Sequence, residues 1–359
     1  MSERSPNPAG AAFGLGAAAL FGASAPLAKL LLARAGPLLL SSLLYLGAAV
    51  ALYVIVAIGG RSRVSREARL QRSDGWPLVG MVTLGGMLGP LLMLFGLQRI
   101  SALAASLLLN FEAPFTAALA VWLFREHLGR RGLCAVLAIV AGAVLLAWQP
   151  GAFRADWIGT LAIVGACLCW GFDNNLTQLV SMRDPAAVAL IKALGAGGCM
   201  LAVAIAAGSA LPAVGIVAGA LLLGGVSYGC SLYLAVRAMR ELGAAREAAY
   251  FATAPFIGAA LSMAVFGQLP RTAEIVAAAL MAAGISLLLR EQHRHVHAHA
   301  ELVHDHVHVH DEHHAHHLAA VAEPHSHAHR HTPLVHEHAH APDAHHRHAH
   351  ARRQAHRDV

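Results

Sequence analysis

Apolar runs of about 20 residues, separated by short polar connections, fill the chain from Ala11 to Leu289. An α-helix needs about 20 such residues to cross about 30 Å of hydrocarbon. Only 13% of the 359 residues are charged, whereas soluble domains carry about 25%. The sequence therefore argues against a soluble enzyme and predicts an all-α integral membrane protein with ten transmembrane helices, at 11–33, 37–58, 75–97, 101–123, 131–148, 157–180, 185–207, 212–236, 243–266 and 272–289.

The placement of arginine predicts how these spans are oriented. Lys and Arg near span ends are retained on the cytoplasmic side of a membrane. With the N-terminus inside, 14 arginines of the apolar body fall at inner span ends and four at outer ends. We therefore expect residues 1–10, and the tail that follows Arg290, to lie in the cytoplasm.

Glycine and proline positions indicate an internal repeat. Phe21–Gly22 in the first span matches Trp170–Gly171 in the sixth at an offset of 149 residues. Ala113–Phe115 in the fourth span matches Ala254–Phe256 in the ninth at an offset of 141. Five spans are an odd number, so the second copy enters the membrane from the opposite side. The expected domains are therefore an inverted five-plus-five repeat, at 11–148 and 157–290.

The order of these motifs resembles the EamA-type transporters of the drug/metabolite transporter superfamily. The Phe/Trp-Gly pairs, the prolines of spans four and nine and the span-four ending Leu123–His127 carry the resemblance, which covers about residues 11–290. The stretch Cys169–Thr177, followed by Asp184-Pro185 and Lys192, is similar to one bacterial subgroup. The second copy departs from the span-four ending, because Gln268 stands where the family commonly has Glu.

This resemblance implies secondary transport, with a small organic metabolite as substrate. It also implies export driven by a proton or exchange gradient, without a required cofactor. We expect the chain to lie in a bacterial inner membrane, with the lipid bilayer and the substrate as its partners. Nucleic acid is not an expected partner, and the chain is expected as a monomer or homodimer.

Ionisable and amide side chains inside the spans mark the candidate site. A charge at mid-membrane is costly unless it is paired or hydrated. Glu112 and Asp173 are the candidate titrating or cation-contacting carboxylates. Glu112 could pair with Lys29 or Lys192, and Asp173 could pair with Lys192, so both lysines are candidate counter-charges or anion contacts. The candidate polar ligands are the amides Asn110, Asn174, Asn175 and Gln178.

Two interpretations of these polar side chains stay open. They could line a hydrated central cavity that binds substrate and a proton, or they could be salt bridges and hydrogen bonds that hold helices in register. Four prolines add a similar choice, because each frees the carbonyl four residues earlier, either for a ligand or as a simple kink. These are Pro26, Pro90, Pro114 and Pro255. The Gly85-Gly86 pair and the G-x-x-x-G at 225–229 indicate close helix packing.

The tail from residue 291 carries 24 of the 25 histidines, mostly as H-x-H or as adjacent pairs. Neutral imidazole binds Ni, Co and Zn. Low complexity and few large apolar residues predict disorder without metal. We therefore expect 291–359 to be a disordered, His-rich cytoplasmic tail with these candidate metal ligands: His293, His295, His297, His299, His304, His306, His308, His310, His313, His314, His316 and His317.

The purpose of the tail leaves alternatives open. It could buffer or sense metal, it could respond to acidification because free imidazole titrates at about pH 6.5, or it could be a neutral accretion. Two alternative functions for the whole chain follow. One is a transition-metal exporter fed by the tail, although the spans contain no histidine and the five cysteines form no evident ligand set. The other is a non-transporting membrane sensor of metal or pH.

Overall fold

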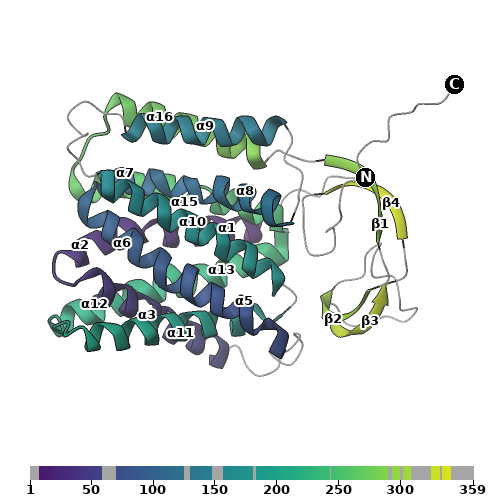
Figure 1. Ribbon diagram of the computed structural model, residues 1–359, viewed down its shortest axis with the longest axis horizontal. Coiled ribbons are helices and arrows are strands. Elements are labelled where there is room, and N and C mark those ends of the chain that lie inside the picture. Colours follow the sequence, from purple (N-terminus) through teal and green to yellow (C-terminus); the bar gives the residue numbers. More distant parts are fainter. Residues whose placement is uncertain are drawn as a thin grey trace.

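The computed structural model describes residues 8–58, 70–124, 130–147, 157–180, 183–242 and 244–289, together with four tail segments at 293–299, 302–308, 325–331 and 334–340. The first group is helical and the tail segments are strands. Figure 1 shows that the helices run roughly side by side along the long axis of the molecule. This is the helical membrane bundle that the apolar runs predict.

The helices of the first half begin at residue 8. They are α1 (Pro8–Gly22), α2 (Ser24–Leu32), α3 (Pro37–Ile58), the short 3-10 helix η1 (Arg72–Asp74), α5 (Gly75–Gly80), the π-helix η2 (Met81–Leu88), α6 (Gly89–Arg99), α7 (Ala102–Leu108), the 3-10 helix η3 (Leu109–Phe111), α8 (Glu112–Phe124) and α9 (Arg130–Ala147).

The second half contains one further π-helix. Its elements are α10 (Trp157–Leu179), α11 (Pro185–Ala206), α12 (Val214–Gly224), the π-helix η4 (Gly225–Cys230), α13 (Ser231–Leu242), α14 (Ala244–Phe251), α15 (Ala254–Phe266) and α16 (Thr272–Leu289).

Seven helical segments within these described ranges are long and apolar enough to cross a membrane. They are Pro8–Leu32, Pro37–Ile58, Arg72–Arg99, Ala102–Trp122, Pro185–Ala206, Val214–Met239 and Glu247–Phe266. The other three predicted spans coincide with α9, α10 and α16, and the last of these contains a shorter apolar helix, Thr272–Leu287. The count of ten membrane spans therefore stays a prediction.

Three helical segments are interrupted shortly before a proline. Ala23 separates α1 from α2 ahead of Pro26, η3 precedes Pro114, and a turn at residues 252–253 separates α14 from α15 at Pro255. Proline lacks a backbone N–H, and its ring clashes with the carbonyl four residues earlier. The interruptions therefore follow directly from the sequence.

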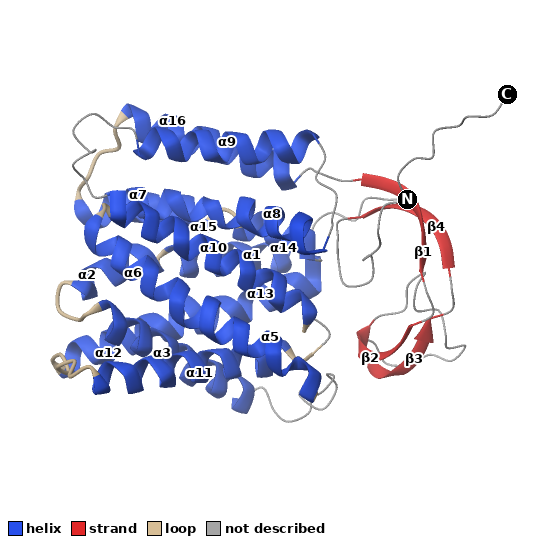
Figure 2. Ribbon diagram, in the orientation of Figure 1, coloured by secondary structure: helices blue, strands red, loops and turns tan. Residues whose placement is uncertain are grey.

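Helix pairing follows a regular pattern across the two halves. α3 packs against α11, α7 against α15, and α9 against α16, which lie together along one edge of the bundle in Figure 2. α1 packs against α13, and α6 packs against α10. In terms of the ten predicted spans, these five pairs join spans 2 and 7, 4 and 9, 5 and 10, 1 and 8, and 3 and 6. Replacing each span by the one five places away gives the same five pairs. The two π-helices also fall in predicted spans that are five places apart.

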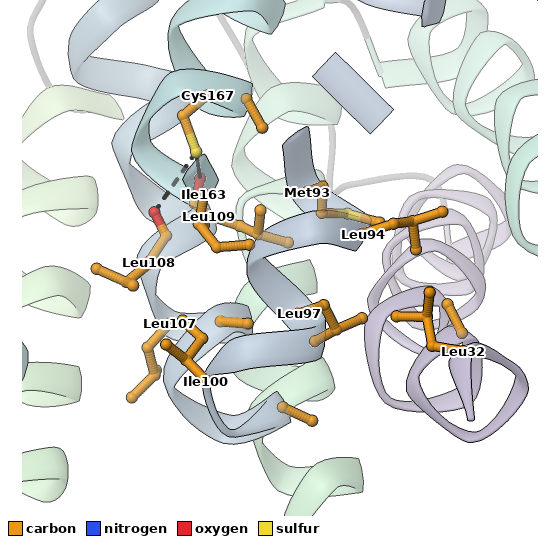
Figure 3. Close-up of a cluster of buried hydrophobic side chains, with 14 of the residues drawn as sticks. Leu32, Met93, Leu94, Leu97, Ile100, Leu107, Leu108, Leu109, Ile163 and Cys167 are labelled. Atoms are coloured by element: carbon orange, nitrogen blue, oxygen red, sulfur yellow. Dashed lines mark hydrogen bonds between the residues drawn. The ribbon is translucent and has the colours of Figure 1, made fainter. Parts of the chain in front are cut away.

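The main hydrophobic cluster extends through much of the bundle, with buried residues from α2, α3, α6, α7, α9, α10, α12, α15 and α16. Figure 3 shows Leu94, Leu97 and Ile163 in this cluster. The Cys167 thiol lies 3.6 Å from the carbonyl oxygen of Leu108 and 3.8 Å from that of Leu109. These contacts make Cys167 a packing residue, as its apolar sequence surroundings suggest.

Large apolar side chains also cover much of the outside of the bundle. The exposed fraction is 81% for Ile58, 74% for Trp122 and 68% for Leu222. Contiguous apolar surface of this kind is rare on soluble proteins. In a membrane these side chains face lipid, which agrees with the composition.

The four strands of the tail differ from the predicted disorder. β1 (His293–His299) pairs antiparallel with β4 (Leu334–His340), and β2 (Leu302–His308) pairs antiparallel with β3 (His325–His331). The physical reason is the H-x-H spacing, because a period of two residues suits a strand. The rest of the predicted tail lies outside the described residues, including His310, His313, His314, His316 and His317.

Candidate functional site

A buried ion pair lies at the centre of the candidate site. The Lys192 ammonium on α11 donates to Oδ2 of Asp173 on α10, and the side chains are 20% and 7% exposed. The second oxygen, Oδ1 of Asp173, is buried without a hydrogen-bond partner among the described residues. An unpartnered carboxylate oxygen in such a place is energetically costly. This oxygen can therefore accept a further donor.

Gly85 in the π-helix η2 brings a backbone segment against Asp173. A Cβ atom built on Gly85 would lie 2.2 Å from Cγ of Asp173, so only glycine fits here. The Gly85 carbonyl oxygen accepts hydrogen bonds from the Tyr45 hydroxyl at 3.0 Å and from Nε1 of Trp170 at 3.1 Å. A π-turn departs from the regular α-helical hydrogen-bond pattern and is frequent at functional sites. Gly85 thus connects α3, η2 and α10 at the ion pair.

Glu112 and the amides of α10 form the second part of the site. Nδ2 of Asn174 lies 2.8 Å from Oε1 of Glu112 and 3.2 Å from Oγ1 of Thr116. Nδ2 of Asn175 donates to the carbonyl oxygens of Thr116 at 3.1 Å and Gly171 at 2.8 Å. These bonds fix the first turns of α8 against α10. Glu112 therefore presents its carboxylate from α8 toward the polar stretch of α10.

The two parts of the site interact electrostatically. The Glu112 carboxyl group interacts electrostatically with the Asp173 carboxylate and the Lys192 ammonium. Tyr45 is in turn within electrostatic range of both carboxylates. Two carboxylates and one ammonium leave one negative charge when all three groups are ionised. We call these three residues, Glu112, Asp173 and Lys192, the acidic cluster.

Lys29 lies elsewhere. Its ammonium donates to the carbonyl oxygen of Leu97 at 2.8 Å and also to that of Ile100. Among the described residues, no ion pair joins Lys29 to Glu112, so the structure does not form this pairing, which the sequence left open. Lys29 instead satisfies carbonyls at the C-terminal end of α6, where a positive charge is favourable.

Replacing this lysine is expected to affect stability rather than transport. Lys29→Met removes hydrogen bonds from a charged donor, each worth about 1.5–3 kcal/mol. The unfolding temperature of the purified protein should fall, while substrate affinity stays at the wild-type value. Thermal unfolding in detergent, measured beside a transport assay, checks both quantities. A variant with unchanged unfolding temperature and lost transport would instead place Lys29 in the site.

The remaining predicted site residues are more scattered. Nδ2 of Asn110 in η3 donates to the carbonyl oxygen of Leu107 at 2.8 Å and lies 3.8 Å from the Met281 sulfur, on the side of α16. Gln178 lies on α10 one turn beyond Asn174 and is partly buried. Pro26 is buried in α2, and Pro90 is the second residue of α6, two positions after the end of the π-helix η2. The structure thus gathers Glu112, Asp173, Asn174, Asn175 and Lys192, and it holds Lys29 apart from them.

Sequence reasoning missed four residues that hold this cluster together. They are Tyr45, Gly85, Thr116 and Trp170. The Gly85-Gly86 pair indicated close packing, but the sequence carries no signal that an acidic side chain is the partner. Trp170 marks the repeat in the sequence, and in the structure its indole N–H donates to the Gly85 carbonyl oxygen. A buried tryptophan usually needs such a hydrogen-bond acceptor.

A row of aromatic rings extends from Tyr45 through both halves of the chain. The Tyr45 and Tyr228 ring centroids are 5.9 Å apart, those of Tyr228 and Phe21 are 5.8 Å apart, and those of Phe21 and Phe251 are 5.2 Å apart. These rings come from α3, η4, α1 and α14. Aromatic faces attract cations through their quadrupole. The acidic cluster therefore has an aromatic neighbourhood on one side.

A second ion pair closes the end of the bundle near η1. Nε of Arg183 lies 2.7 Å from Oδ2 of Asp74, and its Nη2 lies 3.3 Å from Oδ1. The backbone N–H of Gln71 also donates to Oδ2 of Asp74, at 2.7 Å. This ion pair joins the start of the third predicted span to the connection between α10 and α11.

No group of three or more His, Cys, Asp and Glu side chains that could hold a metal ion was found among the residues whose placement is described. All five cysteines are free thiols, and Cys167 and Cys169 are buried.

Buried charged and amide side chains inside an apolar helical bundle define a class of protein. Such residues in membrane helices mark substrate or ion pathways in pumps and transporters. The EamA-like transporter family matches this chain twice, over residues 8–148 and 157–290. The chain belongs to the EamA-like transporter family, and it is an integral membrane transporter rather than an enzyme.

One further comparison concerns a curated relative and another concerns the fold. An "Uncharacterized transporter" of Methanothermobacter thermautotrophicus is 28% identical over 284 residues, which cover 75% of this chain and 82% of that protein. A solved structure titled "Crystal structure of protein" aligns with a TM-score of 0.57 and 21% identity, covering 79% of this chain and 96% of the other. At this identity the second likeness concerns the fold alone.

Proposed function

We propose that the chain is a secondary transporter that exports a small organic metabolite carrying an ammonium group. The acidic cluster is the proposed binding and coupling site, with Glu112 and Asp173 as the cation-contacting carboxylates. Lys192 is the resident counter-charge that an incoming cation displaces. Asn174 and Asn175 position the site, and Gln178 lies one turn beyond it on the same helix.

The charge balance of the cluster carries this proposal. Two carboxylates and one ammonium leave one uncompensated negative charge in a region where lone charges are costly. A proton or a substrate ammonium can supply the missing positive charge. The buried Oδ1 of Asp173, unpartnered among the described residues, offers an acceptor for it. Proton and substrate would then compete for one site, which is the simplest form of exchange.

The aromatic row supports an organic cation over an inorganic one. Tyr45 reaches the cluster through Gly85, and its ring neighbours Tyr228 and then Phe21. Aromatic faces stabilise ammonium groups by about 0.5–2 kcal/mol, with the larger values at desolvated sites. Imidazole or thiolate ligands, which transition metals prefer, are not part of this cluster.

Three observations support alternating access by an inverted repeat. The family matches the chain twice at nearly equal length. The helix pairings are unchanged when each predicted span is exchanged for the one five places along. The π-helices η2 and η4 occupy corresponding spans. In transporters built this way the substrate site lies at the interface of the repeats, and α10 of the second half meets η2 and α8 of the first half at the acidic cluster.

The proposed setting is a bacterial inner membrane with both termini in the cytoplasm. The bias of 14 arginines to four supports this orientation. Export is proposed as the direction because a cytoplasmic metabolite would meet the site from the side where the tail lies.

Uptake of labelled compounds by proteoliposomes, measured against protein-free liposomes, tests the proposal, because exchange of one proton for one ammonium compound moves no net charge. A panel would contain phenethylamine and choline as ammonium compounds, glucose as a neutral compound, succinate as an anion, and Ni²⁺, Co²⁺ and Zn²⁺. Ammonium compounds should be taken up at rates that the Glu112→Gln variant reduces, and the other organic compounds should not be taken up. Uptake of the metal ions alone would favour the metal exporter. A chain that moves no compound, yet whose metal or pH response survives Glu112→Gln and Asp173→Asn, would favour the sensor.

A further inference from the structure

A further buried carboxylate lies in the bundle outside the acidic cluster. Glu247, on α14, is only 8% exposed, and no hydrogen bond or ion pair joins it to another of the residues that the structure describes. A buried charge without a partner is energetically costly, so this side chain does little to stabilise the fold. An ionisable residue within membrane helices is a candidate functional residue by default.

One face of α14 carries Glu247 toward α1. α14 packs against α1 and α13, as Figure 2 shows. A Cβ built on Gly14 of α1 would lie 2.9 Å from Cβ of Tyr250, and the Phe251 ring lies 5.2 Å from that of Phe21 on α1. Residues three and four apart share a helix face. Glu247 therefore lies on the same face as Tyr250 and Phe251, one turn earlier.

The aromatic row leads from the turn after Glu247 to the acidic cluster. From Phe251 it passes through Phe21 and Tyr228 to Tyr45, with neighbouring ring centroids 5.2 to 5.9 Å apart. The Tyr45 hydroxyl donates to the Gly85 carbonyl oxygen at the acidic cluster. The row thus connects two separate carboxylate regions of the bundle.

Two helix ends lie beside the middle of the row. α1 ends at Gly22, directly after Phe21, and α14 ends at Phe251. Pro26 and Pro255 have no N–H, so the carbonyl oxygens of Gly22 and Phe251 lack the helical donor four residues on. The C-terminal ends of helices favour cations, and broken helices bind cations in this way in transporters. Backbone acceptors therefore accompany the aromatic faces.

We propose that Glu247 is an entry site, where the ammonium group of the substrate binds before it reaches the acidic cluster. This inference rests on the proposed function, which supplies the ammonium group. The Glu247 carboxylate pairs with that group, and the aromatic faces and freed carbonyls of the row hold it in transit. Unlike Asp173, Glu247 has no lysine partner among the described residues, so its carboxylate is open to an incoming cation.

The position of Glu247 agrees with entry from the cytoplasm. The apolar segment Glu247–Phe266 starts at this residue. In the proposed orientation this segment begins at the cytoplasmic side. An exported compound would therefore meet Glu247 before the acidic cluster.

Transport measured separately from the two faces of the membrane tests this inference. Inside-out vesicles present labelled phenethylamine or choline to the cytoplasmic face, and right-side-out vesicles present it to the opposite face. Glu247→Gln removes the charge and keeps the shape, and Phe251→Leu removes one ring of the row. The matched control is Glu274→Gln in the first turn of α16, which removes one charge at the proposed outer side.

The expected results differ between the two faces. Glu247→Gln should raise the KM at the cytoplasmic face by about tenfold or more, because one charge-assisted contact is lost, and leave the KM at the opposite face unchanged. Phe251→Leu should raise the cytoplasmic KM by about twofold or more. The control should match the wild type at both faces.

An unchanged cytoplasmic KM in Glu247→Gln, or an equal rise at both faces, would overturn the entry site. Neither result would affect the proposed function, provided that the wild type takes up the compounds and Asp173→Asn does not. A wild-type chain that takes up neither compound would overturn the proposed function and the entry site together.

Discussion

Asp173→Asn is expected to abolish transport of the ammonium substrate. Removing one partner of a desolvated charge pair costs about 2–5 kcal/mol, and each 1.4 kcal/mol is about tenfold in an equilibrium constant. Transport by the folded variant should therefore fall by about 30-fold or more. Initial rates in proteoliposomes, normalised to the amount of folded protein, give this ratio.

The variant also leaves Lys192 buried without its partner, which costs about 3–5 kcal/mol of stability. A double variant, Asp173→Asn with Lys192→Met, removes this problem, because replacing a buried ion pair by uncharged groups is often neutral or stabilising. We expect the double variant to regain the wild-type unfolding temperature and to remain inactive. A double variant that transports normally would show that the pair only holds α10 and α11 in register, which is the structural alternative that the sequence left open.

A methyl group on Gly224 is expected to prevent α3 and α12 from packing. A Cβ built there would lie 1.9 Å from the carbonyl oxygen of Leu44, and one built on Gly47 would lie 2.1 Å from that of Leu221. Both obstacles are backbone atoms, so no side chain can move aside. Overpacking costs about 1–3 kcal/mol and more at rigid sites, and we expect Gly224→Ala or Gly47→Ala to lose about 3 kcal/mol or more.

The yield of monodisperse protein in detergent and its unfolding temperature measure this effect. Gly198→Ala in α11 is the matched control, because nothing lies within 4 Å of a Cβ built there. That change should be neutral or slightly stabilising, since alanine is a better helix former than glycine by about 0.5–1 kcal/mol. Equal behaviour of Gly224→Ala and Gly198→Ala would contradict the close approach of α3 and α12.

The sequence predicted the helical membrane class because apolar runs of span length have few other physical solutions. It also predicted the Asp173–Lys192 contact as one of the available pairings, because opposite charges inside an apolar bundle are stabilised when they pair. It could not identify the partners of Lys29, which are the backbone carbonyl oxygens of Leu97 and Ile100. Every residue has such a carbonyl oxygen, so no sequence pattern marks these two. Backbone acceptors of this kind become visible only when the helix ends are placed in space.

Two other features depended on long-range geometry. Gly85 carries a packing signal in the sequence, but its contact with Asp173 depends on how η2 crosses α10. In the tail, composition predicted disorder, while the spacing of two residues in H-x-H suits strands; the register between segments up to 47 residues apart could not be deduced from either. The spacing of residues along the chain predicts the type of local structure, but it does not show which distant segments pair with each other.

The pH dependence of substrate binding tests the central claim most directly. Binding of the ammonium compound with the fastest uptake would be measured on the full-length protein from about pH 8 to about pH 6. If a proton and the substrate compete for the acidic cluster, affinity must fall as pH falls, by at most about tenfold per pH unit for one displaced proton. The Glu112→Gln variant should show a weaker dependence. A wild-type Kd that is constant across this range, or identical pH profiles for both proteins, would contradict the account.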